Sequence, residues 1–271
     1  MIWPHYCTQL MIELKACSHL LRKGSRSFRV TDKSIVYSKK NSIVSIKLNR
    51  PESINAITQS MRDLIYDALM AYSYDEEAKA CVIYGAGEKG FCSGADLIEF
   101  GKSKSQAESR KIRKQRDLWG LLSQIKKPLI AAVHGYVIGA GLEITSLCDI
   151  RISAEDAVFA MPEVAHGFIP GAGGTQSFPR AIGKTHAMRQ FLGDRHDRMT
   201  AKRAYELGLL HKIVSYDDLL KTAFSFAEDI SLNDLTLLTA IKTAAIDGWY
   251  KPISIGLDLE NRLMEKVKLN N

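Results

Sequence analysis

A short apolar run in the middle of the chain constrains the fold more than any other stretch. Residues 129–133 read Leu-Ile-Ala-Ala-Val between a proline and a glycine, which predicts a fully buried strand. The following Gly139-Ala140-Gly141 lets the backbone turn tightly before a helix that we predict over residues 142–148. Glu143 falls in the first turn of that helix, where N–H groups without intrahelical partners and the positive dipole end gather. A carboxylate beside such a turn is suited to handling an oxyanion and a proton.

Length and composition are those of an ordinary water-soluble globular protein. The chain has 271 residues, of which 46% are hydrophobic and 25% charged, enough for one large domain or a domain with an appendage. No apolar run reaches the roughly 18 residues that a membrane span needs, so we expect no membrane partner.

The cysteines point to a reducing compartment. They are scattered, odd in number and without a CxxC pair, which argues against a disulfide framework and against a zinc site: Cys7, Cys17, Cys81, Cys92 and Cys148. We therefore expect a cytoplasmic protein without a metal. The mitochondrial matrix is the alternative, because residues 1–30 are basic in the manner of a presequence.

Positive charge is concentrated in two segments. The formal net charge is +7, and residues 1–30 and 99–117 each carry an excess of four positive charges, so the rest is close to neutral. We expect residues 1–30 to be a poorly ordered extension. The basic run at 110–116 is expected to be a solvated helix face, with contact to an anionic ligand or to nucleic acid as the alternative. No aromatic residues are interleaved with it, which weakens the nucleic-acid version.

Strand and helix patterns alternate along the chain. Residues 35–37 and 43–48 predict a hairpin, Thr58 is placed to cap an amphipathic helix, and residues 80–84 predict a further strand. This order of two strands, a helix and a strand recurs after residue 128, which favours an α/β fold. Amphipathic helices are predicted in the last part of the chain, over residues 217–230, 235–246 and 256–267.

A glycine-rich stretch after the third predicted strand resembles a nucleotide-binding turn. Residues 85–90 spell G-x-G-x-x-G, but a dinucleotide-binding turn must open directly into a helix. Here it carries Glu88 and runs into a second glycine-bearing turn, so we expect a plain loop. That second turn, residues 94–98, is another place where backbone N–H groups can face a ligand ahead of a helical segment.

A second carboxylate stands beside a second glycine-rich loop. Glu163 follows Glu143 by 20 residues and precedes the loop at 169–175, and proton-transfer sites often pair carboxylates in different environments. His134 ends a buried strand and is expected to be a satisfied core histidine, whereas His166 stays open as a minor candidate base. No serine or cysteine has a base at motif spacing, so a nucleophilic mechanism has little support.

Taken in order, these motifs resemble the crotonase (enoyl-CoA hydratase/isomerase) superfamily from about Ile35 to the C-terminus. Each piece is short, but the ordered set is highly specific. The matching segments are Asn49-Arg50-Pro51, Asn55-Ala56, residues 91–96, Lys127-Pro128, residues 131–135, Gly139-Ala140-Gly141-Leu142-Glu143, residues 148–151, Pro162-Glu163, residues 169–176, Ala204 and Gly208-Leu209.

The resemblance implies a fold and an assembly. It implies an α/β crotonase (ClpP-like) spiral of ββα repeats, with a core and active site over residues 31–200. Residues 201–271 would form a helical C-terminal trimerisation region, giving a homotrimer or a dimer of trimers. Residues 1–30 have no counterpart in the family core, and relatives commonly continue beyond a position equivalent to Asn271 into a last helix.

The resemblance also implies a ligand. An acyl-CoA thioester would be bound with its carbonyl oxygen in an oxyanion hole formed by the N–H groups of Ala95 and Ala140. The family usually has glycine where this chain has Ala140, and we expect the added methyl to narrow the pocket. No separate cofactor is expected, since coenzyme A is part of the substrate. The residues implied in substrate binding are Ala56, Ala95, Asp96, Leu97, Ile98 and Ala140.

Hydratases of this superfamily use two glutamates, and both positions are occupied here. The resemblance therefore implies an enoyl-CoA hydratase in which Glu143 activates water for attack at the β-carbon and Glu163 protonates the α-carbon, a syn addition. One alternative is an enoyl-CoA isomerase or a branched-chain hydratase of the methylglutaconyl type. An alternative of another class is RNA binding through the basic residues 110–116.

Overall fold

The computed structural model describes residues 33–100, 116–193 and 197–269. The chain divides into two units after Thr31, and only the second unit contains described residues. The predicted extension at 1–30 and nearly all of the basic run at 110–116 thus lie outside the described residues. Arg116 is described, and its guanidinium pairs with Asp63 and Asp67 at 3.7 and 3.3 Å.

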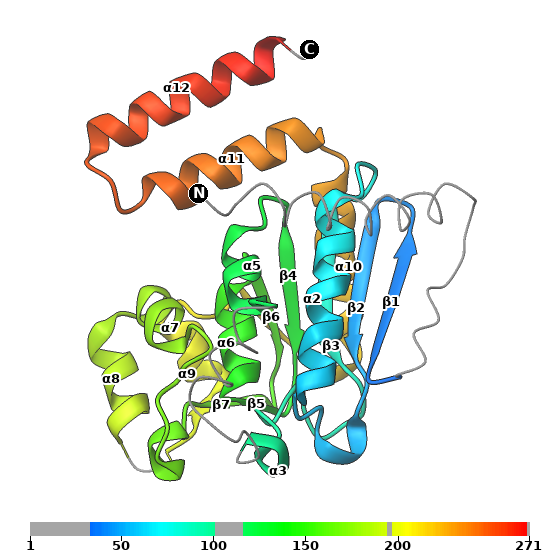
Figure 1. Ribbon diagram of the computed structural model, residues 1–271, viewed down its shortest axis with the longest axis vertical. Coiled ribbons are helices and arrows are strands. Elements are labelled where there is room, and N and C mark those ends of the chain that lie inside the picture. Colours follow the sequence, from blue (N-terminus) through cyan, green and yellow to red (C-terminus); the bar gives the residue numbers. More distant parts are fainter. Residues whose placement is uncertain (1–32, 101–115, 194–196, 270–271) are drawn as a thin grey trace, which may run out of the picture. The chain divides into compact units, whose positions relative to one another are not determined.

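A six-stranded sheet forms the centre of the described unit (Figure 1). Its strands β1 and β2 are antiparallel and all other neighbours are parallel. In spatial order the strands are β1 (Ile35–Lys40), β2 (Ile43–Leu48), β3 (Ala80–Gly85), β4 (Leu129–Val133), β6 (Ile150–Ala154) and β9 (Lys212–Val214). The predicted hairpin and the predicted strands at 80–84 and 129–133 are confirmed.

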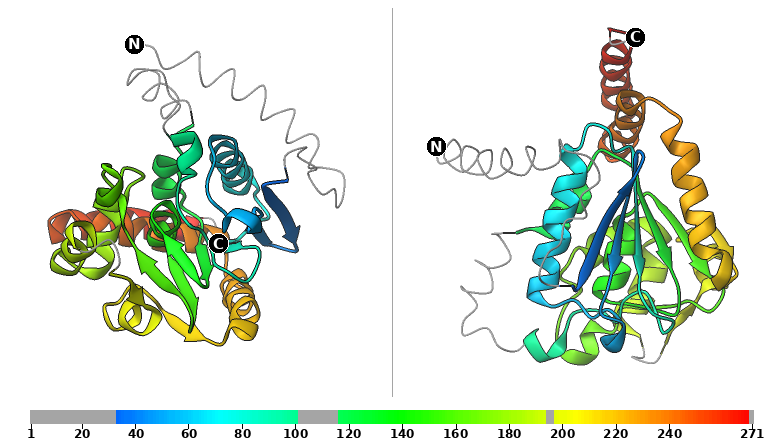
Figure 2. Two further views of the ribbon diagram at one scale, coloured as in Figure 1. Left: turned by 90° about the horizontal axis from the view of Figure 1, so that it is seen from below. Right: turned by 90° about the vertical axis from the view of Figure 1, so that its right-hand side faces the viewer.

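Helices cover both faces of this sheet, which explains why its central strands are apolar throughout. Successive strand residues point to opposite faces. In β4, Leu129, Ala131 and Val133 pack in one apolar cluster, and Ile130 and Ala132 pack in the other. The first cluster lies under α2 (Gln59–Tyr74), α5 (Leu118–Gln124) and α6 (Ala140–Leu147), and the second under α10 (Tyr216–Ser231) (Figure 2).

A second, three-stranded sheet lies beside the first. Its order is β5 (Tyr136–Ile138), β7 (Val158–Ala160) and β8 (Met199–Thr200), with β5 and β7 parallel and β7 and β8 antiparallel. The sequence pattern did not predict β5 or β8. Two or three residues show no readable periodicity, and pairing with distant segments fixes them.

Helix ends follow the expected capping chemistry. The Thr58 hydroxyl accepts a hydrogen bond from the N–H of Met61 at 3.1 Å, as predicted, and Thr200 does the same for Arg203 at the start of α9 (Ala201–Glu206). Helix α7 (Gly174–Ile182) was not predicted, because it begins within the glycine-rich loop and contains Pro179. The remaining helical segments are η1 (Pro51–Ser53), α3 (Leu97–Phe100), η2 (Glu163–His166) and α8 (Lys184–Leu192).

Two helices follow α10 and pack side by side (Figure 1). They are α11 (Leu235–Gly248) and α12 (Ile253–Leu269), so the three predicted C-terminal helices are confirmed. The ammonium of Lys242 ties α11 to the sheet side, donating to the Lys127 carbonyl at 2.9 Å and pairing with Asp149 at 2.6 Å. None of the helices in the described ranges has the length and apolarity to cross a bilayer.

Candidate active site

The first turn of α6 is the structural centre of the candidate site. Gly139 precedes the helix with φ +49°, a conformation that favours glycine, and its N–H donates to the Ala160 carbonyl at 2.9 Å. The helix begins at Ala140, two residues earlier than the predicted Leu142. Ala140 itself is buried in the main apolar core. Because the Glu143 N–H bonds to the Gly139 carbonyl, the Glu143 side chain leaves the helix within its first turn.

Glu143 is buried and held by the backbone of a distant loop. Its Oε1 accepts hydrogen bonds from the N–H groups of Ala172 at 2.9 Å and Gly174 at 2.8 Å. A Cβ on Gly174 would lie 2.6 Å from that oxygen, so a side chain at this position would displace the Glu143 carboxylate. The sequence suggested that the glycine-rich loop accompanies Glu163, but the loop's N–H groups contact Glu143. Two donors on one oxygen fix the orientation of this carboxylate.

Glu163 lies near the same helix start, beside Gly139, and comes from the segment that follows β7. It begins η2, and a Cβ on Gly139 would lie 2.8 Å from its Oε1. Its Oε2 is buried and has no hydrogen-bond partner among the described residues. Burial raises the pKa of the Glu163 carboxyl above its usual range. The first turn of α6 therefore lies between two carboxylates whose surroundings differ.

The turn at Gly94-Ala95 adjoins this helix start. The preceding Cys92 pairs with β5, since its N–H donates to the Tyr136 carbonyl at 3.0 Å and its carbonyl accepts from Ile138 at 2.9 Å. A Cβ on Gly94 would lie 3.9 Å from the Ala140 nitrogen. Two segments that are 45 positions apart in the sequence thus meet at their turns.

The backbone around Ala95 is paired on one side only. Ile57 donates its N–H to the Gly94 carbonyl at 2.8 Å and accepts from the Asp96 N–H at 3.0 Å. Peptide groups alternate in direction along extended backbone, so these two bonds turn the Ala95 N–H away from Ile57. Neither that N–H nor the N–H of Ala140 donates a hydrogen bond to any residue that the structure describes. Two backbone donors therefore stand on adjoining turns beside two carboxylates.

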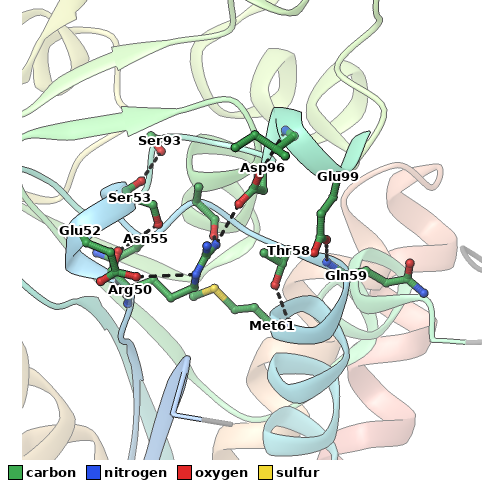
Figure 3. A network of polar contacts seen from close by, with 12 residues as sticks. Arg50, Glu52, Ser53, Asn55, Thr58, Gln59, Met61, Ser93, Asp96 and Glu99 are labelled. Atoms are coloured by element: carbon green, nitrogen blue, oxygen red, sulfur yellow. Dashed lines mark hydrogen bonds and ion pairs between the residues drawn. The ribbon is translucent and has the colours of Figure 1, made fainter. Parts of the chain in front are cut away.

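The other residues predicted to bind substrate lie around the same junction. Ala56 is buried next to Ile57, so it lies across the bridge from Ala95 and Asp96. Leu97 and Ile98 are exposed in α3, at 55% and 77% of their full accessible surface. The Asp96 side chain is turned toward Arg50, at 3.2 Å (Figure 3).

Sequence reasoning missed three contributors to this geometry. The N–H groups of Ala172 and Gly174 carry no side-chain signal, and Arg50 stood out only as part of the matching segment Asn49-Arg50-Pro51, where proline breaks the strand. A charged side chain inside a strand-breaking motif is the one signal that could have drawn attention to Arg50.

The competing residues lie outside this arrangement. His134 is buried, its Nε2 is 2.7 Å from the Gly87 carbonyl and its ring packs edge-on against Tyr216, so it is a satisfied core histidine as predicted. His166 is exposed on η2. Burial raises the pKa of the Cys92 thiol to about 12, which disfavours a thiolate nucleophile.

The described residues give little support for a dinucleotide site or a metal site. The G-x-G-x-x-G loop leads from β3 into the segment that pairs with β5, without opening into a helix, as predicted for a plain loop. No group of three or more His, Cys, Asp or Glu side chains suited to a metal occurs in the described ranges.

A cavity of about 480 Å³ lies next to the loop that holds Glu143. Its walls come from the ends of α5 and α6, the glycine-rich loop and α7. The lining residues are Asp117, Trp119, Gly120, Ser123, Leu147, Gly171, Gly173, Gln176, Ser177 and Arg180. Leu147 lies one helical turn beyond Glu143 on the same face of α6, so the cavity borders the candidate site.

Comparison with known proteins places this geometry in a family context. The sequence model of the family described as enoyl-CoA hydratase/isomerase matches residues 38–269. The mitochondrial enoyl-CoA hydratase of Pongo abelii is 38% identical over 234 residues, 86% of this chain and 79% of that protein. The 2,3-dehydroadipyl-CoA hydratase of Escherichia coli is 34% identical over 229 residues, 84% of this chain and 88% of that protein.

Solved structures agree on the fold. The crystal structure of enoyl-CoA hydratase from Bacillus anthracis superimposes with a TM-score of 0.80 and 31% identity, covering 86% of this chain and 90% of that one. A Geobacillus kaustophilus enoyl-CoA hydratase subunit gives a TM-score of 0.82 and 30% identity, covering 87% and 90%. The predicted α/β crotonase-type fold is confirmed.

Proposed function

Because the chain belongs to the enoyl-CoA hydratase/isomerase family, we propose that it catalyses the reversible addition of water to a 2-enoyl-CoA thioester. One observation carries the proposal: two carboxylates in different environments flank a helix start, beside two backbone N–H groups that have no acceptor among the described residues. Hydration needs a base for water, an acid for carbon and a place for a transient negative charge, which are the parts this arrangement offers.

In the proposed mechanism the two glutamates have opposite roles. Glu143 takes a proton from water as the water oxygen bonds to the β-carbon, and the π electrons move onto the thioester oxygen. The enolate then collapses, and its α-carbon takes a proton from Glu163, whose raised pKa suits a proton donor. Glu143 has gained one proton and Glu163 has lost one, and exchange through solvent restores both. Atoms and electrons balance without an oxidant, a reductant or a metal, so we propose that no cofactor is used.

The N–H groups of Ala95 and Ala140 are proposed to stabilise the enolate oxygen. Each preorganised donor of this kind contributes on the order of 3 kcal/mol to the transition state. The amino end of α6, directly behind Ala140, adds its positive dipole end at the same point. The neighbouring residues Ala56, Leu97 and Ile98 are proposed to border the coenzyme A moiety, and the 480 Å³ cavity to receive the acyl chain.

Two carboxylates favour hydration over isomerisation. Moving a double bond needs a proton taken and returned, which one group can do, whereas adding water needs a base and an acid acting on different atoms. Isomerase activity, and a preference for branched methylglutaconyl-type substrates, are the alternatives that a substrate screen would separate.

The test follows the loss of conjugated enoyl-thioester absorbance with short, long and branched enoyl-CoAs. We expect Glu143→Gln and Glu163→Gln each to lower kcat by about 10²-fold or more, because each removes a proton-transfer group while keeping side-chain volume. Glu155→Gln, an exposed glutamate after β6, is the matched control and should retain full activity. Unchanged turnover in either site variant would contradict the mechanism.

We also propose a homotrimer or a dimer of trimers in the cytoplasm, with the mitochondrial matrix as the alternative compartment. The support for assembly is the apolar surface that α11 and α12 leave exposed, including Ile241, Trp249 and Ile253. Sedimentation equilibrium would check the assembly, and a monomer at micromolar concentration would contradict it.

RNA binding stays a prediction, since residues 110–115 lie outside the described part of the chain.

A further inference from the structure

The Arg50 side chain joins two backbone segments next to the Ala95 donor. Its Nη1 donates to the Ala56 carbonyl and pairs with Asp96 Oδ2 at 3.2 Å (Figure 3). Ala56 immediately precedes Ile57, and Asp96 immediately follows Ala95. The guanidinium therefore crosses between the two segments beside the Ile57–Ala95 bridge that sets the direction of the Ala95 N–H.

Both oxygens of the Asp96 carboxylate are used inside the protein. Oδ2 receives Arg50, and Oδ1 accepts the N–H of Ile98 at 3.2 Å, which caps the start of α3. The side chains of Arg50 and Asp96 are only 23% and 12% exposed, so solvent screens this pair less than it screens a surface pair. Each oxygen of the Asp96 carboxylate thus already has a donor inside the protein, and these donors fix the direction of the side chain.

Asn55 fixes Arg50 from the backbone side. The Asn55 side chain accepts the Arg50 N–H at 2.9 Å and donates to the carbonyls of Ala86, Gly90 and Phe91. Asn55 is fully buried, so these bonds are shielded from water. The guanidinium is thus held from a fixed backbone position and does not swing freely on a surface loop.

We propose that Arg50 and Asp96 are a positioning pair for the oxyanion hole: by holding the Ala56–Ile57 and Ala95–Asp96 segments in register, they keep the Ala95 N–H aimed at the thioester oxygen. The inference rests on the proposed function of Ala95. It changes the role of Asp96 from the substrate-binding residue predicted from sequence to a residue that acts through its neighbour. The general chemistry is that donors a fraction of an ångström out of place stabilise developing charge much less.

The experiment compares Arg50→Met, Asp96→Asn and the double variant with the wild-type enzyme. Each single variant should lower kcat about 10-fold with KM changed less than twofold, since a displaced donor costs less than the 10²-fold or more of a deleted one. The double variant should lose about the same 10-fold, because the two residues act as one unit. Arg50→Lys keeps the positive charge but lacks the planar guanidinium, so its kcat should fall between those of wild type and Arg50→Met.

The matched control is Glu52→Gln. Glu52 is exposed and its Oε1 is 4.0 Å from Arg50 Nε, so the change removes a carboxylate from the same arginine without touching the Ala95 segment. It should leave kcat, KM and thermal stability at wild-type values.

A spectroscopic measurement separates positioning from general structural damage. The absorbance of a bound aryl-conjugated enoyl-CoA moves to longer wavelength as its carbonyl oxygen is polarised. We expect a smaller shift in Arg50→Met and Asp96→Asn than in wild type or Glu52→Gln, at equal occupancy. A KM rise with unchanged kcat and an unchanged shift would show that Arg50 contacts the ligand, and losses that multiply in the double variant would show independent roles. Either result would contradict the proposed positioning role of Arg50 and Asp96. Wild-type protein with neither turnover nor shift overturns the proposed function itself.

Discussion

Glu143 and Glu163 differ in what surrounds each carboxylate, although both lie at the first turn of α6. Glu143 has two backbone donors on Oε1, whereas Glu163 has a buried Oε2 without a hydrogen bond from any described residue. Burial favours the protonated form of a carboxyl, and for Glu163 this effect is the largest cause of its raised pKa. The asymmetry is what a base and an acid acting in one site require.

Glu163→Gln should remove the pH dependence of stability that this carboxyl causes. Because burial raises the pKa of Glu163, the folded state holds its proton to higher pH than the unfolded state does. Wild-type stability should therefore fall as the pH rises from the unfolded pKa, about 4.3, through the raised folded value. Glutamine does not ionise. The Tm of Glu163→Gln relative to that of wild type should therefore rise with pH across that window, and the difference should stay constant at lower pH. Thermal melts from pH 3.5 to 8 check this, and parallel curves would contradict it.

At this scale the sequence predicted the glutamates but not their partners. Both stand next to glycine-rich stretches, which is readable from spacing. The donors to Glu143 come from residues 29 and 31 positions later, and they are main-chain N–H groups that leave no mark in the residue type. Only the fold assigns the loop to Glu143.

The start of α6 depends on a glycine for two separate reasons. Gly139 has a positive φ with ψ −118°, where side chains are strained, and a Cβ there would meet Glu163 Oε1. Gly183, between α7 and α8, also has a positive φ, but a Cβ there would meet nothing within 4 Å. The two positions therefore separate backbone strain from displacement of the carboxylate.

Gly139→Ala and Gly183→Ala should cost similar stability and very different activity. Each places alanine in a region that costs about 1–3 kcal/mol. Only Gly139→Ala also pushes Glu163 out of position, so it should lower kcat more than 10-fold while Gly183→Ala stays near wild type. Urea unfolding and steady-state kinetics on both proteins check this. Equal activities would show that Glu163 adapts to the added methyl.

Among the helices and strands, the length and burial of each element decide whether its sequence pattern predicts it. Strands β2, β3 and β4 are runs of five or six residues, mostly apolar, so their patterns predict them. Strands β5 and β8 have three and two residues and exist because distant segments pair with them. Helix α7 was hidden by its glycine start and by Pro179.

Across the molecule, Lys242 forms an enclosed polar link between α11 and the central sheet. Its side chain is 10% exposed, and its ammonium joins Asp149 and the Lys127 carbonyl. Asp149 in turn accepts the Leu129 N–H at 2.7 Å, at the start of β4. The Lys126–Asp247 pair, at 43% and 40% exposure, also reaches α11 but from the surface.

Lys242→Met should loosen α11 much more than Lys126→Met does. Removing the enclosed ammonium takes its charge from the partly buried Asp149 carboxylate, which keeps only the Leu129 N–H, and its hydrogen bond from the Lys127 carbonyl, at a cost of about 2 kcal/mol. Removing the exposed one should cost less than about 1 kcal/mol. Urea denaturation measures both, and faster proteolytic cleavage within residues 232–252 should accompany Lys242→Met alone. Equal losses would mean that burial does not distinguish the two links.

The sequence supplied the fold at this scale through ordered motifs, not through contacts. Resemblance over most of the chain predicted the α/β spiral, and the family match over residues 38–269 agrees. That Lys242 reaches a carboxylate 93 positions earlier could not be predicted, since long-range pairing follows from packing and carries no local pattern.

The backbone donor at Ala95 has a consequence for how such a site is inherited. A main-chain N–H is encoded by nearly every codon, and at position 95 only proline would delete it. Selection would therefore act less on the identity of residue 95, whose N–H performs the proposed chemistry, than on the residues that orient this N–H. These residues are Arg50, Ile57 and Asp96. A lineage can exchange the side chain at position 95 freely in this respect, while we expect a change at Arg50 to alter the enzyme, although Arg50 performs no step of the proposed reaction.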